Sequence, residues 1–118
     1  MIKLGAQAGS GVIVSADSFN YVNSKLIIDL AARHRVPAIY GTSGTAVDGG
    51  LLYYCVDVVE SYRKAAGYVD RILRGERPAE LPVQQPTKFA MSINRKTAAA
   101  LGLPVPNTLL VSADEVIE

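Results

Sequence analysis

Residues that usually build metal sites, disulfides and catalytic triads are scarce in this sequence. Among its 118 residues there is one cysteine, Cys55, and one histidine, His34. One cysteine can form neither an intrachain disulfide nor a thiolate metal cage, and one histidine cannot supply a histidine pair. We therefore expect no metal and no cofactor. Cys55 is expected to be a small buried hydrophobe, and His34 to be a solvated helix end.

Charge of one sign and long apolar runs are lacking as well. The net charge is +1, and the lysines and arginines are scattered along the chain, which argues against nucleic acid as a partner. No run approaches the roughly 18 apolar residues that span a bilayer. Glycines and Gln7 interrupt the N-terminal apolar stretch, so no signal peptide is predicted and the chain as written is expected to be soluble. Its 49% hydrophobic content is sufficient to bury a core.

Strand and helix signals alternate along the first half of the chain. The β-branched run at 11–15 predicts a buried strand, and the apolar spacing over 19–34 predicts one helix. A second short strand is predicted at 37–40 and a third at 51–56, after a polar, glycine-rich loop at 41–50. Strand, helix and strand within so few residues are typical of a parallel βαβ unit.

The second half continues this alternation. A strong amphipathic period predicts a helix over 58–74, opened by Asp57 and closed by Gly75. The segment 88–94 alternates as a half-buried strand should, and a short helix through Leu101, capped by Asn94, is predicted to follow it. Ser112 and Glu115 have the spacing of a capping box, which predicts a final turn of helix. The predicted class is α/β, a Rossmann-like parallel sheet with flanking helices.

Polar and aromatic side chains lie at the ends of three of the predicted strands. They are Ser15, Asp17 and Ser18 at the end of the first, Tyr40, Gly41, Thr42 and Ser43 at the end of the second, and Tyr53, Tyr54 and Asp57 at the end of the third. Ligands of open parallel sheets bind outside the carboxyl ends of the strands. Rings can stack on a small polar molecule, hydroxyls can orient it, and a carboxylate can hold an ammonium group.

Each candidate also has a simpler interpretation. The preference of aspartate for N-cap positions favours helix capping for Asp17 and Asp57. Strand alternation sends one ring of the pair Tyr53 and Tyr54 inward and the other outward. The loop at 41–50 ends in two glycines, which are most simply a turn that needs positive φ.

Motifs of common enzyme classes do not fit. The glycine-rich segment GAQAGSG precedes its strand, whereas a dinucleotide fingerprint follows one. The loop GTSGTAVDGG follows a strand but has no G-K-[ST] element of a P-loop. No local signature of a serine, histidine and aspartate triad is present, because the histidine lies at a helix end. We therefore expect no catalysis.

The C-terminal half carries several segments in a distinctive order. A helix is followed by a glycine and PAELPV, then by PTKF, by a strand that ends in Ile-Asn, and by KTAAALGL and ADEVI. In this order they resemble the C-terminal part of a family of ABC-transporter substrate-binding proteins. The resemblance extends from about Gly11 to Glu118.

The resemblance implies a type I periplasmic binding protein fold, in which two α/β lobes close on a small ligand. Residues 1–52 and 88–118 would be elements of the C-terminal lobe, and 53–87 would be a crossover and a helix of the N-terminal lobe. The whole chain, 1–118, would then be a single truncated unit. Gly49 and Gly50 would lie at a hinge. The implied function is to bind a small polar solute, such as an amino acid or sugar, for an ABC permease.

The resemblance also implies which residues of this chain contact a ligand. The positions that match are Asp17 and Ser18 after the first strand, Tyr40 and Gly41 at the end of the second, and Tyr54 and Asp57 in the crossover. Relatives usually have Tyr-Gly-x-Asp in the crossover, where this chain has Cys55 in place of the glycine.

The chain departs from the family more in its length than at Cys55, because family members have an export signal and a further lobe. The helix over 58–74 would then leave an apolar face exposed, and we expect a homodimer, formed with exchanged elements. The resemblance implies a periplasmic location, whereas the chain as written would stay in the cytoplasm. Two alternatives stay open: a small α/β enzyme that acts on a phosphorylated substrate at the Gly41–Gly50 loop, and an assembly domain without a ligand.

Overall fold

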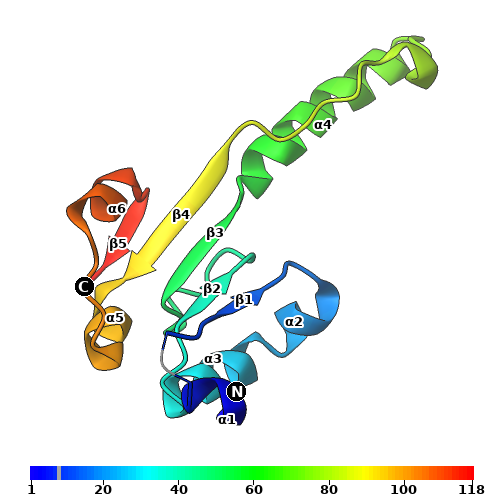
Figure 1. Ribbon diagram of the computed structural model, residues 1–118. Coiled ribbons are helices and arrows are strands. Elements are labelled where there is room, and N and C mark those ends of the chain that lie inside the picture. Colours follow the sequence, from blue (N-terminus) through cyan, green and yellow to red (C-terminus); the bar gives the residue numbers. More distant parts are fainter. Residues whose placement is uncertain (8) are drawn as a thin grey trace. The chain divides into compact units, whose positions relative to one another are not determined.

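Five strands of the described chain form one sheet, and their order in space follows their order in the sequence (Figure 1). The structure is a computed structural model and describes residues 1–7 and 9–118. The strands are β1 (Val12–Val14), β2 (Ala38–Tyr40), β3 (Leu52–Val56), β4 (Phe89–Asn94) and β5 (Glu115–Ile117).

The sheet is parallel apart from one strand pair. β1 pairs in parallel with β2, β2 with β3, and β4 with β5. β3 and β4 run in opposite directions, because the Asn94 N–H donates to the Leu51 carbonyl while the Asp57 N–H donates to the Lys88 carbonyl. The α/β class that the alternation of segments predicts is confirmed.

Helices connect and flank these strands. They are α1 (Ile2–Gly5), α2 (Ser18–Val22), α3 (Ser24–Arg33), α4 (Val58–Leu73), α5 (Arg95–Leu101) and α6 (Asn107–Ser112), with a 3-10 turn at Pro78–Glu80. Within the described residues, none of these helices has both the length and the apolar composition to cross a membrane.

The described chain divides into two compact units. Unit 1 consists of Met1–Cys55 and Ala90–Glu118, and unit 2 consists of Val56–Phe89. Unit 1 contains most of the sheet, and unit 2 contains α4 together with the extended segment that follows it. The chain leaves unit 1 at the end of β3 and re-enters it at the start of β4.

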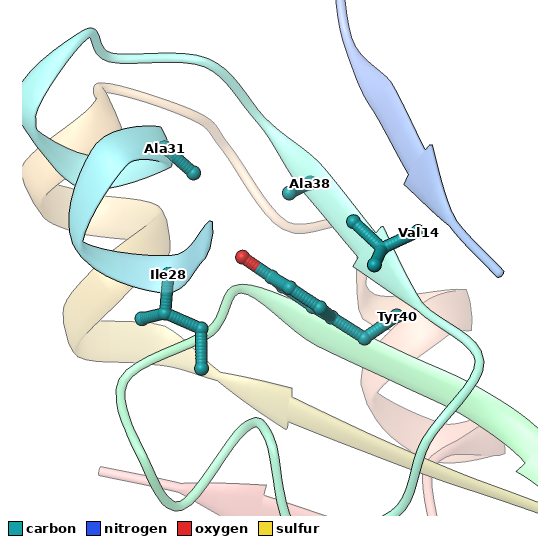
Figure 2. Packing of buried hydrophobic residues seen from close by; sticks show 5 residues of the cluster. All are labelled: Val14, Ile28, Ala31, Ala38 and Tyr40. Carbon is teal, nitrogen blue, oxygen red and sulfur yellow. The ribbon is translucent and has the colours of Figure 1, made fainter. Parts of the chain in front are cut away.

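The core of unit 1 lies between α3 and the first two strands. Its buried residues are Val14 of β1, Ala38 and Tyr40 of β2, and Ile28 and Ala31 of α3. The ring of Tyr40 points from β2 toward α3 (Figure 2). Burial of these apolar side chains supplies the main favourable contribution to folding of the unit, at about 25 cal/mol per Å² of apolar surface.

The single helix predicted over 19–34 is wrong, because the structure has two helices that meet at Asn23. The Asn23 side chain donates to the Phe19 carbonyl at 2.8 Å. The backbone of Asn23 is no longer helical, since its ψ is 11°. An asparagine that bonds locally to the backbone competes with helix continuation. Val22 and Leu26, two residues of the apolar spacing that predicts the helix, are exposed, whereas Ile28 and Ala31 face the core.

The predicted final turn of helix at Ser112 and Glu115 is also wrong. Ser112 ends α6, its hydroxyl donates to the Thr108 carbonyl, and Glu115 begins β5. Asp114 directs the chain into the sheet, since its N–H donates to the Met91 carbonyl at 2.8 Å and its carboxylate accepts from the Met91 N–H at 2.8 Å. Pairing with β4 therefore overrides a local capping signal.

Helix ends follow the sequence signals more closely. Asp57 caps α4 by accepting from the Glu60 N–H at 3.0 Å, and Asn94 caps α5 by accepting from the Thr97 N–H at 3.0 Å. Gly75 has a φ of 100°, as a glycine after a helix end should. The capping box at Asp57 is only half formed, because the Glu60 carboxylate pairs with Arg63 instead.

Candidate functional site

An open depression lies where β1 and β2 end. It is lined by Ala16, Asp17, Ser18, Tyr21, Val22 and Thr42. The two strands end at the same level because Val14 is the register partner of Tyr40. The structure therefore brings together three of the predicted site residues, which are Asp17, Ser18 and Thr42.

Gly41 allows the two chain segments beside the depression to approach closely. Its N–H donates to the Val14 carbonyl at 2.8 Å, and a Cβ at this position would lie 2.9 Å from the backbone nitrogen of Ala16. A larger residue would push these segments apart. Ser43 is exposed in the same loop and is not one of the lining residues.

Asp17 holds a negative charge at the depression. Its carboxylate accepts from the backbone N–H of Asn20 at 2.9 Å, from the Asn20 side chain at 2.6 Å and from the Ser15 hydroxyl at 2.8 Å. The Asn20 N–H, and then the Ser15 hydroxyl, lower the pKa of Asp17, so the group is ionised at neutral pH. Among residues 1–7 and 9–118, no basic side chain forms an ion pair with it. The carboxylate both caps α2 and keeps an uncompensated charge.

Tyr21 is a lining residue that the sequence analysis missed. It lies one helical turn after Asp17, and its side chain is 65% exposed. Residues four apart share one face of a helix, so the spacing of Asp17 and Tyr21 could have predicted that Tyr21 lies beside Asp17. An exposed ring beside an ionised carboxylate can stack on the flat or apolar part of a ligand.

The other predicted tyrosines lie elsewhere. Tyr40 is 2% exposed in the core, where burial raises its pKa to about 12. Tyr53 packs against the core and Tyr54 is exposed, so they face opposite ways, as strand alternation predicts. None of the three lines the depression. Their roles as ligand contacts stay predictions.

Asp57 lies in unit 2 and has its charge compensated. Its carboxylate caps α4 and pairs with the Lys88 ammonium at 2.9 Å, and the Lys88 bond is the main reason that its pKa is lowered. It stands at a crevice of about 230 Å³ between one face of α4 and residues 84–88. In this crevice Lys64 donates to the Thr87 hydroxyl at 3.0 Å. Asp57 and Asp17 are therefore electrostatically different, although both are caps.

The two predicted hinge glycines belong to a tightly bonded turn of unit 1. Gly49 has a φ of 104°, which favours glycine. The Gly50 N–H donates to the Thr45 carbonyl at 2.8 Å, and the Gly49 carbonyl accepts from the Thr97 hydroxyl at 2.9 Å. A hinge role for these glycines stays a prediction.

The described part of the chain contains no cluster of three or more histidine, cysteine, aspartate or glutamate side chains that could hold a metal ion. The depression at β1 and β2 offers instead a carboxylate, two aliphatic hydroxyls and a phenol ring. These are groups that bind and orient a small polar molecule.

Comparisons with known proteins agree with this description. A family model described as ABC transporter substrate binding protein matches residues 2–117. No curated protein matches the chain significantly. Among solved structures, a conserved domain protein from Vibrio cholerae is 22% identical with a TM-score of 0.83, over 91% of this chain and 36% of that one.

Two further structures are similar. An ABC domain from Streptococcus pneumoniae in complex with L-Trp is 21% identical with a TM-score of 0.83, over 98% of this chain and 40% of that one. A ligand-free, open substrate binding protein with adhesive properties from Clostridium difficile is 20% identical with a TM-score of 0.62, over 90% of this chain and 35% of that one. The chain thus spans between 35% and 40% of these structures, and the predicted fold is confirmed.

Proposed function

Since the chain belongs to the ABC transporter substrate-binding protein family, we propose that it contributes to binding a small polar solute for an ABC transporter, and that the depression at β1 and β2 forms one wall of the binding site. The observation that carries the proposal is the carboxylate of Asp17, which is ionised, held by three hydrogen bonds and not paired with a basic group of the described chain. Solute transfer to a permease, without catalysis, is the activity that we propose for the whole protein.

The chemistry of the depression favours an amino acid as the solute. An ammonium group would form a charge-assisted hydrogen bond with Asp17, whereas an uncharged sugar would not use this charge. The hydroxyls of Ser18 and Thr42 would donate to the solute carboxylate, and the Tyr21 ring would stack on its side chain. The similar streptococcal structure is in complex with L-Trp, which supports an aromatic amino acid as the first solute to test.

We further propose that the chain contributes to two lobes of a solute-binding protein, with 1–52 and 88–118 in one lobe and 53–87 as a crossover and helix of the other, a division close to that between units 1 and 2. One face of α4 supports this assignment: Val59, Tyr62, Val69 and Leu73 are all exposed on it. We call this face the α4 stripe. A second lobe would cover the α4 stripe in the whole protein, and a second copy of the chain, with exchanged elements, would cover it in isolation. We expect the whole protein to act in the periplasm.

The test is titration calorimetry of the chain with L-tryptophan, other amino acids and glucose. L-tryptophan is expected to bind, and Asp17→Asn is expected to weaken binding at least tenfold, because asparagine caps a helix equally well but has no charge. The matched control is Asp48→Asn, which removes an exposed carboxylate of loop 41–50 outside the depression.

Equal weakening by the two substitutions would contradict the site. If none of the amino acids or glucose binds, the alternative of an assembly domain without a ligand is favoured. Binding of glucose that is insensitive to Asp17→Asn would contradict an amino acid as the solute.

A further inference from the structure

The loop that contributes Thr42 to the depression is bonded to the end of β4 and the start of α5. The Asn94 side-chain amide donates to the Ala46 carbonyl at 2.9 Å, and the Thr97 hydroxyl donates to the Gly49 carbonyl at 2.9 Å. Each bond joins residues 48 positions apart in the sequence. Asn94 is 5% exposed and Ala46 is fully buried, so water does not compete for the first bond.

Hydrogen bonds inside the loop continue from these contacts toward the depression. The Gly50 N–H donates to the Thr45 carbonyl at 2.8 Å. The Thr45 hydroxyl, which is buried, donates to the Thr42 carbonyl at 2.9 Å. A connected set of bonds therefore extends from α5 to the residue that lines the depression.

The orientation of the Asn94 side chain is fixed by two different partners. Its oxygen accepts from the Thr97 N–H at 3.0 Å, and its nitrogen donates to Ala46. A residue that only capped α5 would need the oxygen alone, and aspartate or serine would serve as well. The amide nitrogen is the feature that helix capping does not explain.

We propose that Asn94 and Thr97 are positioning residues that fix loop 41–50, and thereby hold Thr42 in place at the candidate site. The fixing of loop 41–50 concerns the loop alone, whereas the role of Thr42 at the candidate site rests on the proposed function. Asn94 would then both cap α5 and hold loop 41–50.

The test of the loop is hydrogen exchange of the chain, followed at the amides of Asp48, Gly49 and Gly50. Thr97→Val removes the hydroxyl donor and keeps the shape, so exchange there is expected to become about tenfold faster. Thr97→Ser keeps the donor and is expected to restore the original rates. Lys96→Ala, an exposed change in the same turn of α5, is the control and should leave the loop unchanged.

Asn94→Asp is the second variant, because aspartate caps α5 and lacks the amide donor. It is expected to speed exchange of the same three amides while α5 keeps its protection. The proposal is overturned if Thr97→Val leaves loop exchange unchanged, or if it speeds exchange evenly throughout unit 1, as a purely structural role would.

Titration with L-tryptophan tests the effect on the site. Thr97→Val is expected to raise Kd severalfold, with recovery in Thr97→Ser. A loosened loop with an unchanged Kd would overturn the link to the site. If the unaltered chain binds no solute, the proposed function and the link to the site both fail, while hydrogen exchange still decides whether the two residues hold the loop.

Discussion

Gly50 lies directly against the ring of Tyr40. A Cβ at position 50 would be 2.8 Å from Cε2 of this ring and 2.7 Å from the carbonyl oxygen of Thr45. Neither neighbour can easily move, because Tyr40 is a buried core residue and Thr45 is bonded within its loop. At this contact the loop of the candidate site rests on the core.

Gly50→Ala is therefore expected to destabilise unit 1 by about 1–3 kcal/mol, the usual cost of overpacking. Urea denaturation followed by circular dichroism measures the effect. Gly67→Ala is the control, because a Cβ in that part of α4 meets nothing within 4 Å and should stabilise the helix by about 0.5–1 kcal/mol. Loss of stability in Gly67→Ala, or none in Gly50→Ala, would contradict the packing.

The pKa of Tyr40 predicts a loss of stability at alkaline pH. Burial raises this pKa to about 12 from the ordinary value of 10.0, so the folded chain holds the phenol proton more tightly than the unfolded chain. The stabilisation is complete below pH 10 and is lost as the pH rises from about 10 to 12. The melting temperature should fall less steeply over this range in Tyr40→Phe, which cannot ionise. Parallel pH profiles of the two proteins would show that Tyr40 is not responsible.

Ser92 predicts a stabilising substitution. Its hydroxyl is fully buried in β4 and has no hydrogen-bond partner within the described chain. An unsatisfied hydroxyl carries a desolvation cost that alanine avoids, so Ser92→Ala is expected to be neutral or to stabilise by up to about 1 kcal/mol. Urea denaturation checks this, and a clear loss of stability would reveal a partner for the hydroxyl.

The α4 stripe predicts self-association of the isolated chain. Sedimentation equilibrium at micromolar concentration should give a mass above that of one chain. Val69→Lys places a charge within the stripe and is expected to shift the mass toward the monomer. Gly67→Lys adds the same charge to α4 outside the stripe and should have no such effect. A mass equal to one chain for the unaltered protein would contradict the homodimer.

Elements with strong local signals were predicted well. Asp57, Asn94 and Gly75 mark helix ends because a cap or a positive φ depends on a few neighbouring residues. The break at Asn23 and the strand at Glu115–Ile117 were missed. The strand forms because β4 offers backbone partners, which the sequence around Ser112 does not reveal.

The sequence predicts only part of the candidate site, because some of its features depend on contacts between distant parts of the chain. The strand-end rule predicts Asp17, Ser18 and Thr42, since it needs only the positions of two parallel strands. It does not predict the burial of Tyr40, because a three-residue strand is too short to assign its faces by alternation. The bonds from Asn94 and Thr97 join residues 48 positions apart and leave no periodic signal.

Both bonds that hold loop 41–50 end on main-chain carbonyls, those of Ala46 and Gly49. Every amino acid carries this acceptor, so the two hydrogen bonds do not depend on which side chains the loop carries. Thr42, Ser43, Val47 and Asp48 can therefore diverge in evolution without detaching the loop. Such an arrangement would separate the side chains that face the depression from the main-chain contacts that hold the loop.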